Sequence, residues 1–346
     1  MMQQGLCTLG DHVADPLTGQ RTSQAERHSN IFEYLSRAEP LGFDTIVVGE
    51  HHFSDFIMSV PQLFLAWFAA KTEKVRLATG VTLLPHHDPV RLAEDFATLD
   101  VISDGRAEMW VGKGVEPKVY QHFGQNATDA VARQQEGLEL LLRLWTERDL
   151  HWHGQFRAPL AGITLQPRPV QQPHLPVYVS CSNPEATIVP AKLGLNLVLT
   201  GLAFDLEQLK PMVSRYHQEW GKCGHSHQPK ISLLAHCHIA ESSQAALKHL
   251  AQYQFSFQRW VFSKRFGMAE KDVELPPRIT NLGAQECVIA VGSPQQVLDK
   301  IAQLCEMSGC DRFIYQGDYG GQPWPRVMQS LELYGQHVLP EVSKLA

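Results

Sequence analysis

The chain has 346 residues, a formal net charge of −6 and a hydrophobic content of 44%. This length suits two average domains or one α/β barrel with insertions, because such barrels need about 250 residues. Its charges are mixed along the chain, so no basic patch points to a nucleic-acid partner. No apolar run reaches the roughly 20 residues of a membrane span, and no signal peptide is visible, so we expect a cytoplasmic protein.

The seven cysteines are scattered along the chain, and none belongs to a CxxC pair. This spacing favours reduced thiols over a disulfide framework. It also gives no cysteine-built metal site.

The predicted elements alternate between short apolar strands and helices. The first half gives strands at Leu6–Leu9, Thr45–Val48, Arg76–Thr82 and Ala107–Val111, with helices near 23–39, 60–72, 89–103 and 129–147. The second half gives strands at Val177–Ser180, Asn196–Leu199, Ile231–Ile239 and Arg312–Gln316, with helices after Pro184 and near 204–220, 294–307 and 323–338. Strands and helices in this order predict an α/β protein with the (β/α)8 architecture of a TIM barrel.

Two segments depart from this alternation. Residues 148–176 are rich in Pro, Gln, His and Trp and form an excursion from the barrel. Residues 243–291 carry a helix followed by an aromatic, proline-bearing stretch, which we interpret as an insertion at the C-terminal mouth of the barrel. No linker or repeat interrupts the chain, so we expect residues 1–346 to form a single domain.

The tip of the second predicted strand carries Glu50, His51 and His52. A carboxylate beside two imidazoles suits acid–base chemistry near neutral pH, because histidine titrates there. In parallel barrels the carboxyl ends of the strands carry the chemistry. From these residues alone, the group can be catalytic, part of a metal site, or a structural cap of the next loop.

A metal site needs further ligands that converge on one point. The candidate pairs are His86 with His87, His151 with His153, and His236 with His238. None of them has the spacing of a compact zinc motif, so we expect no metal.

Two later strand tips suit a phosphate group. Gly112-Lys113-Gly114 places small residues around a cation, although a lone Gly-x-Gly is also common in turns. Cys181-Ser182-Asn183 precedes a helix start, where backbone N–H groups and polar side chains can hold an anion. Ser182 and Asn183 are equally ordinary helix N-caps.

The tip Glu50-His51-His52-Phe53 and the helix start at 89–95, Pro-Val-Arg-Leu-Ala-Glu-Asp, resemble the bacterial luciferase-like, flavin-dependent monooxygenases. The resemblance extends from Leu6 to Pro340. It implies a TIM barrel that uses reduced FMN and O2 to oxygenate a small organic substrate through a flavin hydroperoxide. It also implies a homodimer and a separate NAD(P)H-dependent flavin reductase. The chain itself shows no Gly-rich dinucleotide fingerprint.

The resemblance further implies roles for single residues. His51 would handle protons at the flavin, Glu50 would set its orientation, and His52 would pack or orient the loop. Gly80-Val81 would form a non-proline cis peptide beneath the flavin ring. The implied flavin-binding residues are Gly80, Val81, Lys113, Arg133, Cys181, Ser182 and Asn183. Lys113 stands where the family usually has arginine, and Arg133 is equally well explained as a surface helix residue.

Three other functions stay open at this point. They are hydride transfer with a deazaflavin, a non-catalytic flavin-binding subunit and a metal-dependent hydrolase. The presence of both Glu50 and His51 argues against the non-catalytic subunit. The sequence does not identify the organic substrate.

Overall fold

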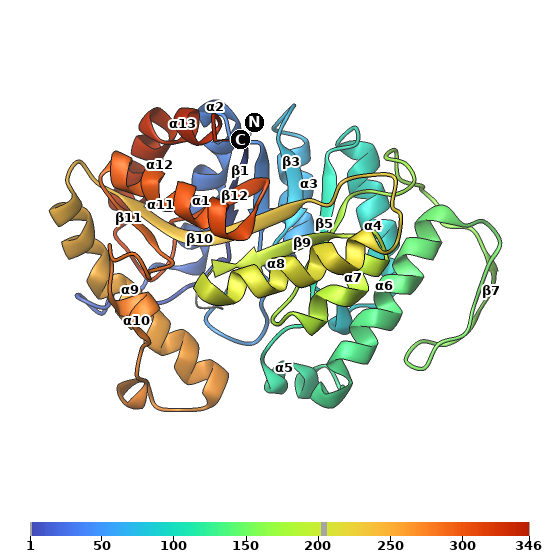
Figure 1. Cartoon of the computed structure of the whole chain (residues 1–346). Helices are drawn as coiled ribbons and strands as arrows, with labels where there is room; N and C mark the ends of the chain where they lie inside the picture. Colours follow the sequence, from blue (N-terminus) through green and yellow to red (C-terminus); the bar gives the residue numbers. More distant parts are fainter. Residues whose placement is uncertain (1, 202–205, 346) are drawn as a thin grey trace.

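The computed structural model describes residues 2–201 and 206–345 and contains a closed parallel barrel (Figure 1). The barrel strands are β1 (Gln3–Thr8), β2 (Thr45–Val48), β3 (Arg76–Thr79), β5 (Ala107–Gly112), β8 (Val177–Ser180), β9 (Asn196–Thr200), β10 (Ile231–Ile239) and β12 (Arg312–Gln316). Neighbours in this order pair in parallel, and β12 also pairs with β1, which closes the ring. The predicted TIM barrel is therefore confirmed.

Helices surround the barrel and bury their apolar faces against it (Figure 1). They are α1 (Gln24–Ser36), α2 (Ala38–Leu41), α3 (Pro61–Ala69), α4 (Pro89–Ile102), α6 (Ala130–Thr146), α7 (Ile188–Lys192), α8 (Leu206–Gly221), α11 (Pro294–Ser308), α12 (Trp324–His337) and α13 (Leu339–Val342). The short helix α5 (Pro117–His122) follows β5 at the carboxyl end of the barrel. The predicted start of α8 near Phe204 lies outside the described residues. Among the residues described, no helix is both long and apolar enough to cross a membrane.

The predicted strand Arg76–Thr82 is in fact two strands, which corrects the sequence prediction. A cis peptide at Gly80-Val81, implied by the family resemblance, separates β3 from β4 (Thr82–Leu83). β4 then pairs with β5 through Thr82 and Leu83. A Cβ at Gly112 of β5 would lie 2.6 Å from Cγ2 of Val81, so glycine there leaves room for the valine at the strand break.

The excursion at 148–176 contains an antiparallel hairpin, β6 (Leu150–Trp152) and β7 (Leu160–Ile163). Glu136 of α6 holds the hairpin loop, because its carboxylate accepts N–H groups from Gln155, Phe156 and Arg157 at 2.7–3.2 Å. The Glu136 carboxylate therefore joins the hairpin loop to α6, a helix of the barrel's outer layer.

The insertion at 243–291 is more helical than predicted. The helix α9 runs over Ser243–Phe266 and includes the aromatic residues that we expected in an irregular stretch after it. α10 (Pro277–Thr280) and β11 (Ala290–Gly292) follow. The aromatic side chains of Phe257 and Trp260 are buried on α9, so helix packing fixes this part of the chain. In Figure 1 the C-terminal part of α9 and α10 lie on the same side of the barrel as α5.

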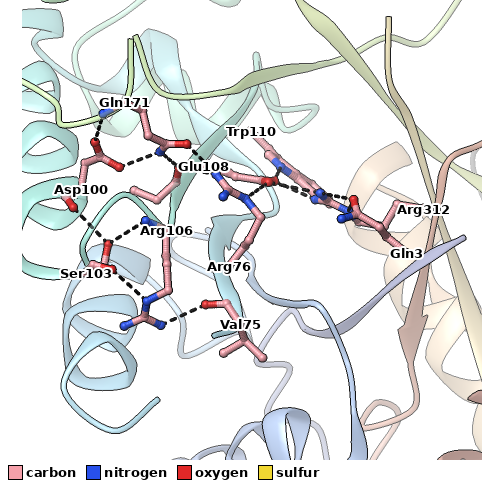
Figure 2. A network of polar contacts seen from close by, with 11 residues as sticks. Gln3, Val75, Arg76, Asp100, Ser103, Arg106, Glu108, Trp110, Gln171 and Arg312 are labelled. Atoms are coloured by element: carbon pink, nitrogen blue, oxygen red, sulfur yellow. Dashed lines mark hydrogen bonds and ion pairs between the residues drawn. The ribbon is translucent and has the colours of Figure 1, made fainter. Parts of the chain in front are cut away.

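A buried ionic network closes the N-terminal end of the barrel (Figure 2). Arg312 of β12 donates two hydrogen bonds to Glu108 of β5, at 2.7 and 3.2 Å, and Arg76 of β3 bonds the same carboxylate. Burial raises the pKa of Glu108, but Arg312 and Arg76 outweigh this effect and lower the pKa to about 2. The indole N–H of Trp110 donates to Oε2 of Glu108 at 3.1 Å. Glu108 is thus a saturated structural carboxylate.

Candidate active site

A cavity of about 360 Å³ opens at the carboxyl ends of the barrel strands. Most of its lining comes from the strand tips that the sequence singled out. These residues are Glu50, His51, His52, Gly80, Val81, Gly112, Lys113, Gly114, Ser180, Cys181 and Ser182. Residues separated by more than 130 positions therefore meet in one site, as parallel strands of a barrel require.

Several lining residues were missed by sequence reasoning. They are Leu9, Leu83, His86, Val115, Glu116, Val119, Thr200, Leu234 and Arg265. His86 was named only as a possible metal ligand, although its place in the loop after the third predicted strand puts it on the same edge of the barrel as Glu50. Arg265 had none, because it belongs to the last turn of α9 and the path of that insertion was not predictable.

Glu50 is a buried carboxylate in the cavity wall. Its Oε1 accepts hydrogen bonds from Nε2 of His52 and Nε2 of His87, both at 2.8 Å, and its Oε2 accepts the N–H of Leu83 at 3.2 Å. Burial raises the pKa of Glu50, but the bonds from His52 and His87 outweigh this effect and lower the pKa to about 2. Glu50 is therefore a carboxylate at every physiological pH.

The prediction that Glu50 orients His51 is wrong, because its hydrogen bonds go to His52 and His87. The His51 ring instead stacks on Phe56, with ring centroids 3.9 Å apart and planes 13° apart. Burial lowers the pKa of His51 to about 4, although the nearby charge of Glu50 opposes this shift. His51 is therefore neutral near pH 7 and can donate or accept a hydrogen bond in the cavity.

Of the two cations predicted at the phosphate, only Lys113 lines the cavity. The guanidinium of Arg133 lies over the Phe156 ring, 4.5 Å from its centroid. The Tyr120 hydroxyl donates to the carbonyl of Lys113. Burial raises the pKa of Tyr120 to about 12, and the positive charge of Arg133 opposes that shift. Arg133 thus lies outside the cavity lining.

Of the residues predicted at the tip of β8, some line the cavity and one does not. Ser182 and Cys181 line the cavity. Asn183 does not, because its Oδ1 accepts the N–H of Ala186 at 2.9 Å and caps the next turn. Burial raises the pKa of the Cys181 thiol to about 12, so this side chain is an uncharged thiol.

The cavity residues match a flavin in their chemistry. Val81, Leu9 and Leu234 provide apolar surface for a ring system, while Lys113 and Ser182 provide a cation and a hydroxyl for a phosphate. His86 also lines the cavity, and its Nδ1 contacts Oε1 of Gln125 at 2.9 Å. Its Nε2 is buried without a hydrogen-bond partner, which leaves one polar atom for a ligand.

The His236–His238 pair, which was weighed as a metal ligand set, has other neighbours. His236 contacts Gln254 at 3.0 Å and stacks on Tyr319, and His238 stacks on His249. Within residues 2–201 and 206–345, no three His, Cys, Asp or Glu side chains are grouped so that they could hold a metal ion.

Comparison with known proteins places this geometry in a family. Residues 2–312 match the model of the luciferase-like monooxygenases. The oxygenase component of the flavin-dependent trigonelline monooxygenase of Acinetobacter baylyi is 26% identical over 335 residues, covering 93% of this chain and 92% of that protein.

Two solved structures share the fold along nearly the whole chain. Monooxygenase RslO1 from Streptomyces bottropensis has 26% identity and a TM-score of 0.85, covering 98% of this chain and 99% of that one. The oxygenating constituent of 3,6-diketocamphane monooxygenase from Pseudomonas putida, in complex with FMN, has 21% identity and a TM-score of 0.79, with 99% of each chain covered. The chain belongs to the luciferase-like monooxygenase family.

Proposed function

We propose that the protein uses reduced FMN and O2 to oxygenate a small organic substrate at the mouth of the barrel. The supporting observation is that three groups of residues line one cavity. They are Glu50, His51 and His52; Gly80 and Val81 at the strand break; and Lys113 and Ser182. Bound reduced FMN would supply the electrons that activate O2, a task for which amino-acid side chains have no chemistry of their own.

The chain's residues would then bind and shield the flavin. Gly80 and Val81 would support the ring, and Lys113 and Ser182 would hold the phosphate. Cys181 would contact the flavin as an uncharged thiol. Arg133 and Asn183 lie outside the lining, so we assign them to supporting the loops that carry Lys113 and Ser182.

His51 is the proposed proton handler. Its pKa of about 4 makes it a neutral imidazole, which can accept a proton at one nitrogen while it donates from the other. Glu50 contributes a fixed negative charge beside it. Stacking on Phe56 holds the His51 ring in one plane and limits the entry of water on that side.

Two partners belong to the proposal. A separate NAD(P)H-dependent reductase would supply reduced FMN, in agreement with a relative that is named as an oxygenase component. A second copy of the chain would cover α3 and the residue before it, where Leu63, Trp67 and Val60 are exposed apolar side chains. Sedimentation analysis tests the homodimer, and Leu63→Lys should return it to a monomer.

Anaerobic titration with reduced FMN, and in parallel with a reduced deazaflavin, tests the cofactor. We expect tighter binding of FMN. Gly112→Ala should weaken it about tenfold, because the new Cβ would lie 2.6 Å from Cγ2 of Val81 and displace it. Gly221→Ala on α8 is the matched control, since a Cβ there meets nothing within 4 Å. Tighter binding of the deazaflavin, or no flavin binding, would overturn the proposal.

A further inference from the structure

A single carboxylate oxygen in the cavity wall serves two imidazoles. Oε1 of Glu50 accepts from His52 and from His87 at the same distance of 2.8 Å. His52 lines the cavity, whereas His87 belongs to the loop after β4 and does not line it. The exposed fractions of the side chains are 0% for Glu50, 12% for His52 and 26% for His87. The carboxylate thus joins a histidine of the cavity to one that is more open to solvent.

We propose that His87 is a positioning residue, which shares the charge of Glu50 and thereby sets how tightly His52 holds a proton. The catalytic consequence of this sharing rests on the proposed function, whereas the sharing itself does not. No residue of the family resemblance gave His87 a role, and in the sequence it stood only as a candidate metal ligand.

The hydrogen bonds fix the protonation pattern of both rings. Each Nε2 must carry a hydrogen to donate to Glu50, so Nδ1 is the atom at which either ring gains or loses a proton. A protonated His52 is stabilised by the negative charge of Glu50. Because His87 donates to the same oxygen, it neutralises part of that charge and weakens the hold on the His52 proton.

Other charges around His87 act on the same balance. Asp95 of α4 interacts electrostatically with His87 and is paired with Arg91, whose Nε lies 3.3 Å from Oδ1 of Asp95. His86 of the same loop also interacts electrostatically with His87, and Glu94 of α4 acts on Asp95. None of these groups bonds Oε1 of Glu50, so the direct competition is between His52 and His87.

Glu50 also forms a hydrogen bond close to the strand break at Gly80-Val81. The N–H of Leu83, two residues after Val81, donates to Oε2 of Glu50 at 3.2 Å. Loss of His87 therefore leaves Glu50 held by His52 and Leu83 alone. This makes His87 a link between the solvent-side loop and the wall of the proposed flavin site.

Histidine titration by NMR in the flavin-free protein tests the proposal without any enzymatic reaction. His87→Leu removes the second donor, so the midpoint of His52 should rise by about one pH unit. His87→Gln keeps an N–H donor that never titrates and should leave the midpoint near that of the wild type. If His87→Leu fails to fold, His87→Asn takes its place. The asparagine amide is too short to reach Glu50, so the midpoint of His52 should rise in this variant too.

His151→Leu, on the exposed hairpin, is the control for removing a histidine. An unchanged His52 midpoint in folded His87→Leu or His87→Asn would overturn the proposal, and so would equal shifts in the leucine and glutamine variants. A shifted midpoint in a protein that fails to bind reduced FMN would support the charge sharing and count against the proposed function. The pH dependence of flavin oxidation should shift in the same variants if both hold.

Discussion

The two ends of the barrel each contain a buried glutamate, and the two glutamates differ in their partners. Counted as whole residues, Glu108 at the N-terminal end is 1% exposed and Glu50 at the mouth is 2% exposed, and the pKa of each is lowered to about 2. Glu108 is held by the guanidinium groups of Arg312 and Arg76, which stay charged at any physiological pH. Glu50 is held by the imidazoles of His52 and His87, which carry a positive charge only when they are protonated.

Burial and pKa alone therefore do not separate a structural carboxylate from a functional one. A permanent cation fixes the charge balance of its neighbourhood, whereas an imidazole lets the balance change by one proton. The location agrees with this distinction, since barrel enzymes keep chemistry at the C-terminal face and stability at the other.

Removing the permanent cation should have the largest effect. Arg312→Met leaves Glu108 buried with only Arg76, and we expect the free energy of unfolding to fall by about 3–5 kcal/mol. Denaturant unfolding measures this loss. Adding Glu108→Leu should recover part of it, because an apolar pair replaces a buried carboxylate that has lost one of its two cations. A double variant no more stable than Arg312→Met would contradict the structural role of the pair.

The mouth should show the opposite pattern, with a large effect on rate and a small one on stability. His51→Ala removes the proposed proton handler, and we expect turnover with saturating reduced FMN to fall about 100-fold. His51 lines the cavity and is not one of the buried core residues, so the free energy of unfolding should change by less than about 1 kcal/mol. His122→Ala, at an exposed position of α5, is the control. Equal turnover in both variants would remove His51 from the mechanism.

Asp318 provides a third buried carboxylate, whose charge is incompletely balanced. It shares Arg27 with Asp11, and it accepts from Thr8 at 2.6 Å. Burial raises the pKa of Asp318 to about 6, although Arg27 opposes the shift. The folded state therefore binds this proton more tightly than the unfolded state does, so the stabilisation is complete below about pH 4 and is lost as pH rises through 6.

Asp318→Asn should flatten that pH dependence. Between pH 4 and pH 7 the wild type should lose roughly 2–3 kcal/mol of unfolding free energy through this group, and the variant should lose less. Urea unfolding at both pH values measures the difference. If wild type and variant lose the same amount, the raised pKa of Asp318 is wrong.

The smallest effects should separate the two neighbours at the β8 tip. Ser182→Ala removes a cavity hydroxyl and should weaken flavin binding about fivefold with little loss of stability. Asn183→Ala removes the cap on Ala186 and should cost about 1 kcal/mol of stability with flavin affinity retained. Calorimetric binding and thermal unfolding on both variants would show whether the roles are instead reversed.

The sequence was sufficient for the barrel because each strand has a short apolar run and a polar tip. The tips also placed Glu50, His51, Lys113 and Ser182 around one cavity. Hydrogen-bond partners were not predictable, because the choice of Glu50 between His51 and His87 depends on how two loops meet in space. The length of α9 was missed for a similar reason, since its aromatic residues are fixed by burial and not by helix propensity.

Rapid mixing of the protein and reduced FMN with aerated buffer tests the central claim most directly. If the mouth cavity holds the flavin and controls its reaction with O2, the absorbance should show oxidation on a different time course from free reduced FMN. His51→Ala should change that time course, and His122→Ala should not. Oxidation at the rate of free reduced FMN, in wild type and variants alike, would contradict the assignment of this cavity as the oxygenation site.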